Sequence, residues 1–145
     1  MENLISQTRW VNYSAKEVFI VLSDFTNMKY FPVVTESAEL TFDKDSCKIR
    51  TSVLEMVATL SDASPFDRLE FDLKGDQAPL KNTKLYINII EDGENRAGLN
   101  MEARFDMPAF VMTMFRSKLV EVLDAVVKML SDAPFRTIIE RNGIK

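Results

Sequence analysis

The chain has 145 residues, 46% of them hydrophobic and 28% charged, a composition typical of one globular domain with a core of its own. A net charge of −4 argues against nucleic-acid binding, which needs a basic stripe. The sequence also lacks the block of like charges that would indicate binding to an anionic membrane surface. The absence of histidine excludes His-based catalytic triads and metal sites, and a single cysteine, Cys47, excludes an intramolecular disulfide.

The N-terminal residues carry neither the basic region nor the apolar region of a signal peptide. No apolar run approaches the ~18 residues of a membrane span. We therefore expect a cytoplasmic location and no membrane insertion.

The first predicted strand, residues 4–13, ends at the segment Ser14-Ala-Lys-Glu17, which has the form of a capping box. A helix follows with Val18, Phe19 and Leu22 on one face, and it ends near Asp24. A second short helical turn is predicted over 26–30, before Pro32.

Six strand-like segments then alternate apolar and polar residues, with short turns between them. Their predicted bounds are 35–42, 47–51, 53–60, 67–74, 80–90 and 96–106. The clearest is 67–74, where Leu69, Phe71 and Leu73 alternate with charged residues. Consecutive strands on short turns predict an antiparallel sheet with one apolar face and one wet face.

The segment from Ala109 to Ser131 contains no Gly or Pro, and Pro108 stands at a plausible first helical position. It predicts a helix roughly 35 Å long that buries one face against the sheet. The predicted buried stripe consists of Met112, Phe115, Leu119, Val122, Val126 and Met129. We treat residues 1–133 as a single domain and 134–145 as a tail without assigned structure.

This order of elements resembles the START-like superfamily, also called SRPBCC or helix-grip. The resemblance rests on Ser14-Ala-Lys-Glu17-Val-Phe, on Leu22-Ser-Asp24-Phe25 with Asn27 and Pro32, on Ser64-Pro65, on Met107-Pro108 and on Leu130-Ser-Asp. It implies an α+β helix-grip fold, in which a curved antiparallel sheet of seven strands wraps a long C-terminal helix. Two short helices would lie between the first and second strands. The superfamily includes carriers, cyclases and receptors, so the resemblance implies no single reaction.

The resemblance also implies an internal pocket for a hydrophobic or lipid-like molecule between the sheet and the C-terminal helix. The candidate ligand-binding residues are Leu22, Phe25, Tyr30, Met56, Phe71, Ile87, Met101, Phe105, Met112, Phe115 and Leu119. We predict no catalytic residue, no metal and no cofactor. A solid core made of the same residues is the alternative, because apolar stripes fill cores more often than they line pockets.

Two other functions remain open. The first is an enzyme of the polyketide cyclase or aromatase type, which would need a carboxylate or tyrosine in the cavity, such as Asp24, Tyr30 or Tyr86. The second is a ligand-free interaction module, and a homodimer is left open. Glu102 and Arg104 share the polar face of the last predicted strand. This placement predicts a solvent-exposed ion pair that contributes little to stability.

Overall fold

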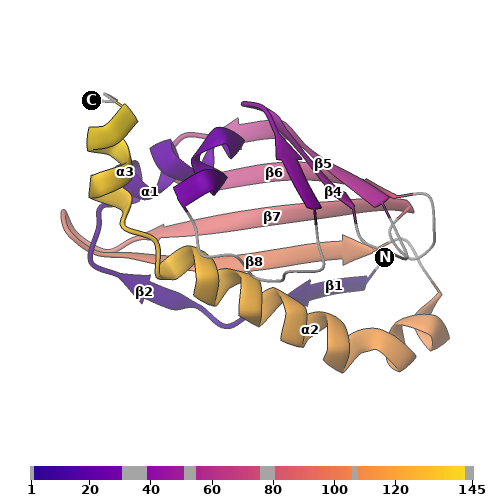
Figure 1. Ribbon diagram of the computed structural model, residues 1–145. Helices are drawn as coiled ribbons and strands as arrows, with labels where there is room; N and C mark the ends of the chain where they lie inside the picture. The colour runs from indigo at the N-terminus through magenta and orange to yellow at the C-terminus, as the bar shows by residue number, and fades with distance from the viewer. Residues whose placement is uncertain (1, 31–38, 51–54, 76–80, 106–107, 143–145) are drawn as a thin grey trace.

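The computed structural model describes residues 2–30, 39–50, 55–75, 81–105 and 108–142. The elements, in chain order, are β1 (Glu2–Ile5), β2 (Arg9–Val11), α1 (Ala15–Leu22), the 3-10 helix η1 (Phe25–Tyr30), β3 (Glu39–Phe42), β4 (Ser46–Arg50), β5 (Glu55–Ser64), β6 (Arg68–Gly75), β7 (Lys81–Glu91), β8 (Ala97–Phe105), α2 (Ala109–Ser131) and α3 (Phe135–Asn142). Figure 1 shows the sheet with α2 running along its inner face.

The strands form one antiparallel sheet in the order β1-β8-β7-β6-β5-β4-β3, with β2 also paired to β8. β1 and β2 are two pieces of the predicted first strand, interrupted near Ser6. There the Ser6 backbone N–H donates to the Met101 carbonyl, and the Ser6 hydroxyl accepts from the Met101 N–H. Counting the two pieces as one strand, the predicted α+β architecture with a curved seven-stranded sheet is confirmed.

The predicted alternation of the strands is also confirmed in the middle of the sheet. In β6, Leu69, Phe71 and Leu73 are buried, and the charged residues between them are partly exposed. In β8, Leu99, Met101, Ala103 and Phe105 are likewise buried on the inner face. Because side chains alternate with a period of two, this register places every apolar side chain of both strands toward α2.

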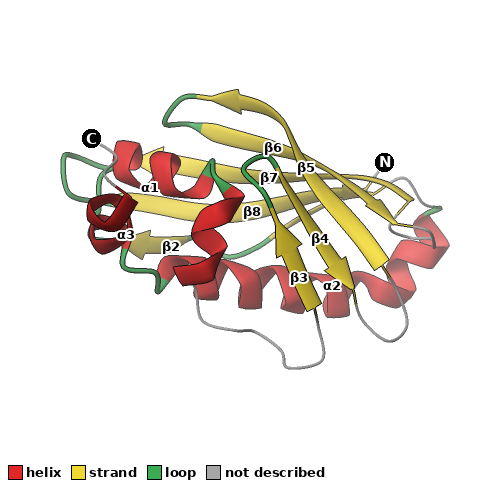
Figure 2. Ribbon diagram, turned by 45° about the horizontal axis from the view of Figure 1, so that its top comes forward, coloured by secondary structure: helices red, strands yellow, loops and turns green. Residues whose placement is uncertain are grey.

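The capping box is present at the start of α1. The Ser14 hydroxyl accepts from the Glu17 N–H at 3.1 Å, and the Glu17 carboxylate accepts from the Ser14 N–H at 3.0 Å. After α1 the buried Asn27 side chain donates to the Val21 carbonyl at 2.9 Å. These bonds satisfy backbone groups that the helix ends leave free, and they hold α1 and η1 together at one end of the sheet (Figure 2).

α2 has the predicted bounds, but Pro108 precedes the helix as its N-cap residue instead of being its first residue. The buried side is also rotated from the predicted stripe: Met112, Leu123, Val127 and Leu130 are buried. Phe115 and Val122, both in the predicted stripe, are 42% and 52% exposed. The reason is the rotation of the helix, because Phe115 and Val122 lie on a side of α2 that turns away from the sheet when Leu123 and Val127 face it. Figure 1 shows α2 passing along the sheet.

Residues 135–142, which were left without structure in the sequence analysis, form α3. Phe135 and Ile138 are completely buried, and the Phe135 ring lies edge-on to Tyr13 at 5.2 Å between centroids. Arg136 donates to the Glu17 carboxylate of α1 at 2.8 Å. The segment therefore packs on α1 as part of the core.

Candidate functional site

A cavity of about 310 Å³ lies between the inner face of the sheet and α2. β4 to β8 supply one wall and the middle and C-terminal turns of α2 supply the other, while α1 and η1 close one end. The lining residues are Val21, Leu22, Asp24, Phe25, Cys47, Met56, Ala58, Phe71, Leu73, Leu85, Ile87, Met101, Phe105, Leu119, Val122, Leu123, Val126, Met129 and Leu130. Val122 belongs both to the lining and to the exposed surface, so the cavity reaches the outside beside α2.

The wall is apolar except at two residues, Asp24 and Cys47. One Asp24 carboxylate oxygen accepts from both the backbone N–H and the hydroxyl of Thr26, at 2.9 and 2.6 Å, and so initiates η1. Burial raises the pKa of the Cys47 thiol. A protonated thiol is a poor nucleophile, and the neighbouring Lys48 pairs with Glu55 at 2.9 Å instead.

Most of the candidate ligand-binding residues border this cavity. Those that line it are Leu22, Phe25, Met56, Phe71, Ile87, Met101, Phe105 and Leu119. Met112 is buried in the core but does not line the cavity, and Phe115 is 42% exposed and lies outside it. The Tyr30 side chain lies outside the described residues.

The remaining lining residues were missing from the candidate set, although the sequence analysis had already placed several of them on a predicted buried face. Leu73 was already predicted to alternate with charged residues in its strand, and Val122, Val126 and Met129 were in the predicted stripe of α2. Leu123 and Leu130 were missed because the helix is rotated toward them. Cys47 entered the sequence analysis only as the single cysteine of the chain.

Of the three groups considered for a cyclase, Asp24 lines the cavity, Tyr86 does not, and the Tyr30 side chain lies outside the described residues. Tyr86 lies on the outer face of the sheet, between the guanidinium groups of Arg68 and Arg104 at 3.9 and 5.2 Å from its ring centroid. Among the described cavity residues, Asp24 is the only carboxylate.

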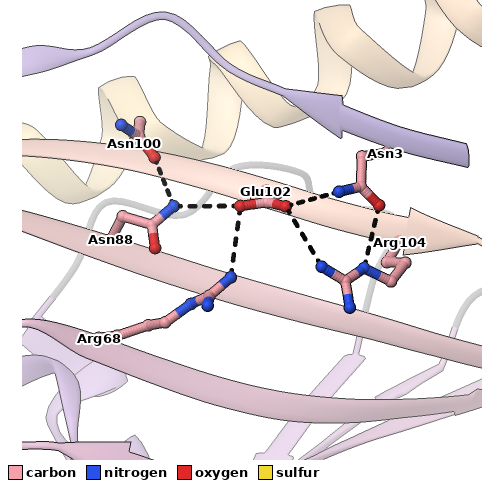
Figure 3. Close-up of polar contacts among 6 residues, drawn as sticks. All are labelled: Asn3, Arg68, Asn88, Asn100, Glu102 and Arg104. Atoms are coloured by element: carbon pink, nitrogen blue, oxygen red, sulfur yellow. Dashed lines mark hydrogen bonds and ion pairs between the residues drawn. The ribbon is translucent and has the colours of Figure 1, made fainter.

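Glu102 and Arg104 lie on the outer face as predicted, but Glu102 is less solvated than expected. Its side chain is only 16% exposed and accepts from Asn3, Arg68 and Asn88 at 3.0, 3.4 and 3.5 Å. Figure 3 shows these groups meeting at Glu102, with Arg104 bound to Asn3 beside it. This network lies on the opposite side of the sheet from the cavity. We therefore interpret it as a structural network that links neighbouring strands on the outer face.

Two further features concern the described residues alone. None of the helices has the length and apolar content that crossing a bilayer requires. Within the same ranges, no group of three or more Cys, Asp or Glu side chains is placed to hold a metal ion.

No protein-family model matches the chain, and no curated protein matches it. Solved structures do match. A norcoclaurine synthase mutant from Thalictrum flavum, in complex with a transition-state analogue, is 11% identical, with 97% of this chain and 96% of that chain covered and a TM-score of 0.67. A protein from Thermobifida fusca is 15% identical, with 97% and 95% covered and a TM-score of 0.66.

The Aha1 dimer from Colwellia psychrerythraea is 13% identical, with 92% of this chain and 99% of that chain covered and a TM-score of 0.62. Identities this low indicate a shared fold and no more. Together with the sheet topology and the position of α2, they show that this chain has a helix-grip fold.

Proposed function

We propose that this protein binds or carries a small, uncharged hydrophobic molecule in the cavity between the sheet and α2, as a START-like protein would. The observation that carries the proposal is the cavity of about 310 Å³ with an almost wholly apolar wall. Voids in packed interiors rarely exceed a water molecule, whereas ligand pockets begin at roughly 300 Å³. The size favours a compact ligand.

The energetics also favour occupation. A ligand that buries about 200 Å² of apolar surface would gain roughly 5 kcal/mol before the entropic cost of binding. Hydrophobic burial is non-directional, so an apolar wall selects for size and shape and not for particular polar groups.

Three methionines, Met56, Met101 and Met129, border the cavity. Their unbranched, flexible side chains adapt to ligands of different outline. The complex of norcoclaurine synthase with a transition-state analogue gives support by analogy, because that protein of the same fold accommodates a small molecule.

The experiment is a titration with an environment-sensitive apolar dye. We expect Met101→Trp, which fills the cavity, to weaken dye binding by about tenfold or more, because the dye loses the apolar contacts that hold it. Phe115→Trp is the matched control, because Phe115 lies outside the cavity, and it should bind like the wild type. Circular dichroism would confirm that both variants are folded. The absence of dye binding in the wild type, or equal binding in all three proteins, would disprove the proposal.

Cys47 provides an independent readout. Since its thiol is the only one in the chain and borders the cavity, a bound dye should slow its alkylation in the native protein. The denatured protein should react at the same rate with or without dye. Unchanged alkylation at saturating dye would place the dye elsewhere.

A further inference from the structure

The side of α2 that points away from the sheet exposes large apolar side chains. Phe110 and Met114 are 72% and 75% exposed, and beside them Phe115 and Val122 are 42% and 52% exposed. The strands β1, β2 and β8 pack on the other side of the helix (Figure 1). Exposed apolar residues are ordinary when they are scattered, but a group of neighbours on one helix is typical of a surface that binds a partner.

The centre of this surface has a symmetric spacing along the helix. It consists of six residues at intervals of four, four, three, four and four, which we call the α2 face: Phe110, Met114, Lys118, Glu121, Ala125 and Met129. At about 3.6 residues per turn they span an arc of about 100°, opposite the buried Leu123 and Val127. The first five are exposed, and Met129 is half-buried. Because the intervals are the same in both directions, two antiparallel copies of α2 can pair about a two-fold axis with every residue of the face opposite another.

In this pairing the opposing residues are complementary in charge and in size. Lys118 lies opposite the partner's Glu121, and Met114 lies opposite the partner's Ala125. The two-fold axis makes each contact occur twice. Neither Lys118 nor Glu121 makes an ion pair within the described part of its own chain, so both are available to a second copy. Rows of residues four apart are also the ridges that pack most often between helices, and the small Ala125 leaves room for a methionine.

The other charged residues of α2 do not oppose this pairing. Arg116 lies on another side of the helix and has an interaction of its own, and Asp124 accepts from the Gln7 N–H at 2.8 Å. Lys128 lies at the edge of the α2 face. It would meet the first turns of the partner's α2, where residues 109–115 carry no charge. The pairing therefore places no like charges of α2 opposite each other.

From these observations we propose that the α2 face binds a second copy of this chain in a two-fold dimer. A lipid surface fits the face less well, because Glu121 would lose water beside the acyl chains without gaining a cation. In the dimer it gains Lys118 of the partner subunit. The contact consists of one helix from each copy, at the small end of specific interfaces, so the dimer should be weak and should depend on concentration.

The dimer would also affect the cavity, a consequence that rests on the proposed function. Val122 and Met129 line the cavity from α2, and Val122 is exposed as well. Phe110 of the partner subunit lies opposite Met129 in this pairing, so dimerisation would bring an aromatic ring to the outer rim of the cavity. Neither Phe110 nor Met114 lines the cavity itself. The dimer should therefore change how fast a ligand enters and leaves, and not the wall that holds it.

The test is sedimentation equilibrium of the full-length protein from about 1 µM to 1 mM, a range that covers a weak interface. We expect the wild type to pass from monomer to dimer as its concentration rises. Phe110→Ser/Met114→Ser should weaken dimerisation by about a hundredfold or more, because large apolar contacts are lost on both copies. Ile90→Ser is the control: it removes an apolar side chain that is 41% exposed on the sheet, and it should dimerise like the wild type.

Charge reversal tests the register of the pairing. Lys118→Glu and Glu121→Lys should each weaken dimerisation by about tenfold or more, since each places like charges opposite each other twice. An equimolar mixture of the two variants should dimerise like the wild type, because both ion pairs form again between unlike copies. Lys16→Glu makes the same change of charge at an exposed position of α1 and should have no effect.

Three results would overturn the dimer: a monomeric wild type over the whole range, equal loss in the Ile90 control, or a mixture of the two charge variants that stays monomeric. A monomeric wild type that binds phosphatidylcholine vesicles would assign the α2 face to a lipid surface instead.

Dye release tests the effect on the cavity separately. Bound dye should leave the wild-type dimer about threefold or more slowly than it leaves the Phe110→Ser/Met114→Ser monomer. The affinity for dye at monomeric concentrations should be equal in both proteins. Equal release rates would show that the dimer leaves the rim open. A wild type that dimerises but binds no dye would contradict the proposed function and leave the dimer intact.

Discussion

The two ends of the core are packed differently. Where α1 and α3 meet, Val18, Phe135 and Ile138 have no exposed surface, and Phe135 contacts Tyr13 edge to face. Under the middle of α2, by contrast, the sheet and the helix enclose about 310 Å³. One domain thus contains a densely packed end and a hollow region. The difference indicates that stability is concentrated at the dense end, which leaves the hollow region free to hold a ligand.

The largest expected effect comes from truncating a ring at the dense end. Phe135→Ala should lower the free energy of unfolding by about 3–5 kcal/mol, because it leaves a void among fully packed neighbours. Met56→Ala at the cavity wall should cost only about 1–2 kcal/mol, since Met56 already lacks partner atoms on its cavity side. Urea unfolding followed by circular dichroism measures both. Equal losses would mean that the two regions are packed alike.

The next effect should differ in sign between the two regions. Ala58→Leu adds volume at the cavity wall and should stabilise the protein by about 0.5–2 kcal/mol. Ala97→Leu adds the same group at a completely buried position of β8 and should destabilise it by about 1–3 kcal/mol through overpacking. Thermal unfolding of both variants tests this. Destabilisation by Ala58→Leu would contradict a hollow region in the native state.

A smaller effect should depend on pH at the dense end. Burial alone would raise the pKa of Glu17, but hydrogen bonds from Ser14 and Arg136 outweigh it and hold that pKa below its ordinary value of 4.5. A depressed carboxyl pKa contributes stability above the unfolded pKa, and that stability is lost as the pH falls through the folded value. Glu17→Gln should therefore cost about 1 kcal/mol at neutral pH and progressively less below about pH 4.5.

Unfolding curves at neutral and acidic pH provide the measurement. Glu140→Gln is a useful control, because Glu140 is on α3 and has none of the capping contacts of Glu17. A loss for Glu17→Gln that stays constant across the acidic range would show that the carboxylate charge is not what stabilises this end.

Much of the fold could be predicted from the sequence, because its patterns are local. The alternation in β6 identified the inward face of that strand, and the absence of Gly and Pro from Ala109 to Ser131 gave the bounds of α2. The capping box marked the start of α1. Each of these features depends on residues within a few positions of one another, and their spacing has a direct steric or hydrogen-bonding meaning.

The remaining features required the tertiary structure. Phe115 and Leu123 are both apolar residues of α2, and only the extent of the sheet decides that one is exposed and the other buried. α3 buries Phe135 and Ile138 within eight residues, too short a segment for a periodic pattern to stand out. The cavity depends most on the whole fold. Its volume is the space left between a curved sheet and a helix after their side chains have packed, and it results from the distance between two surfaces that no local pattern encodes.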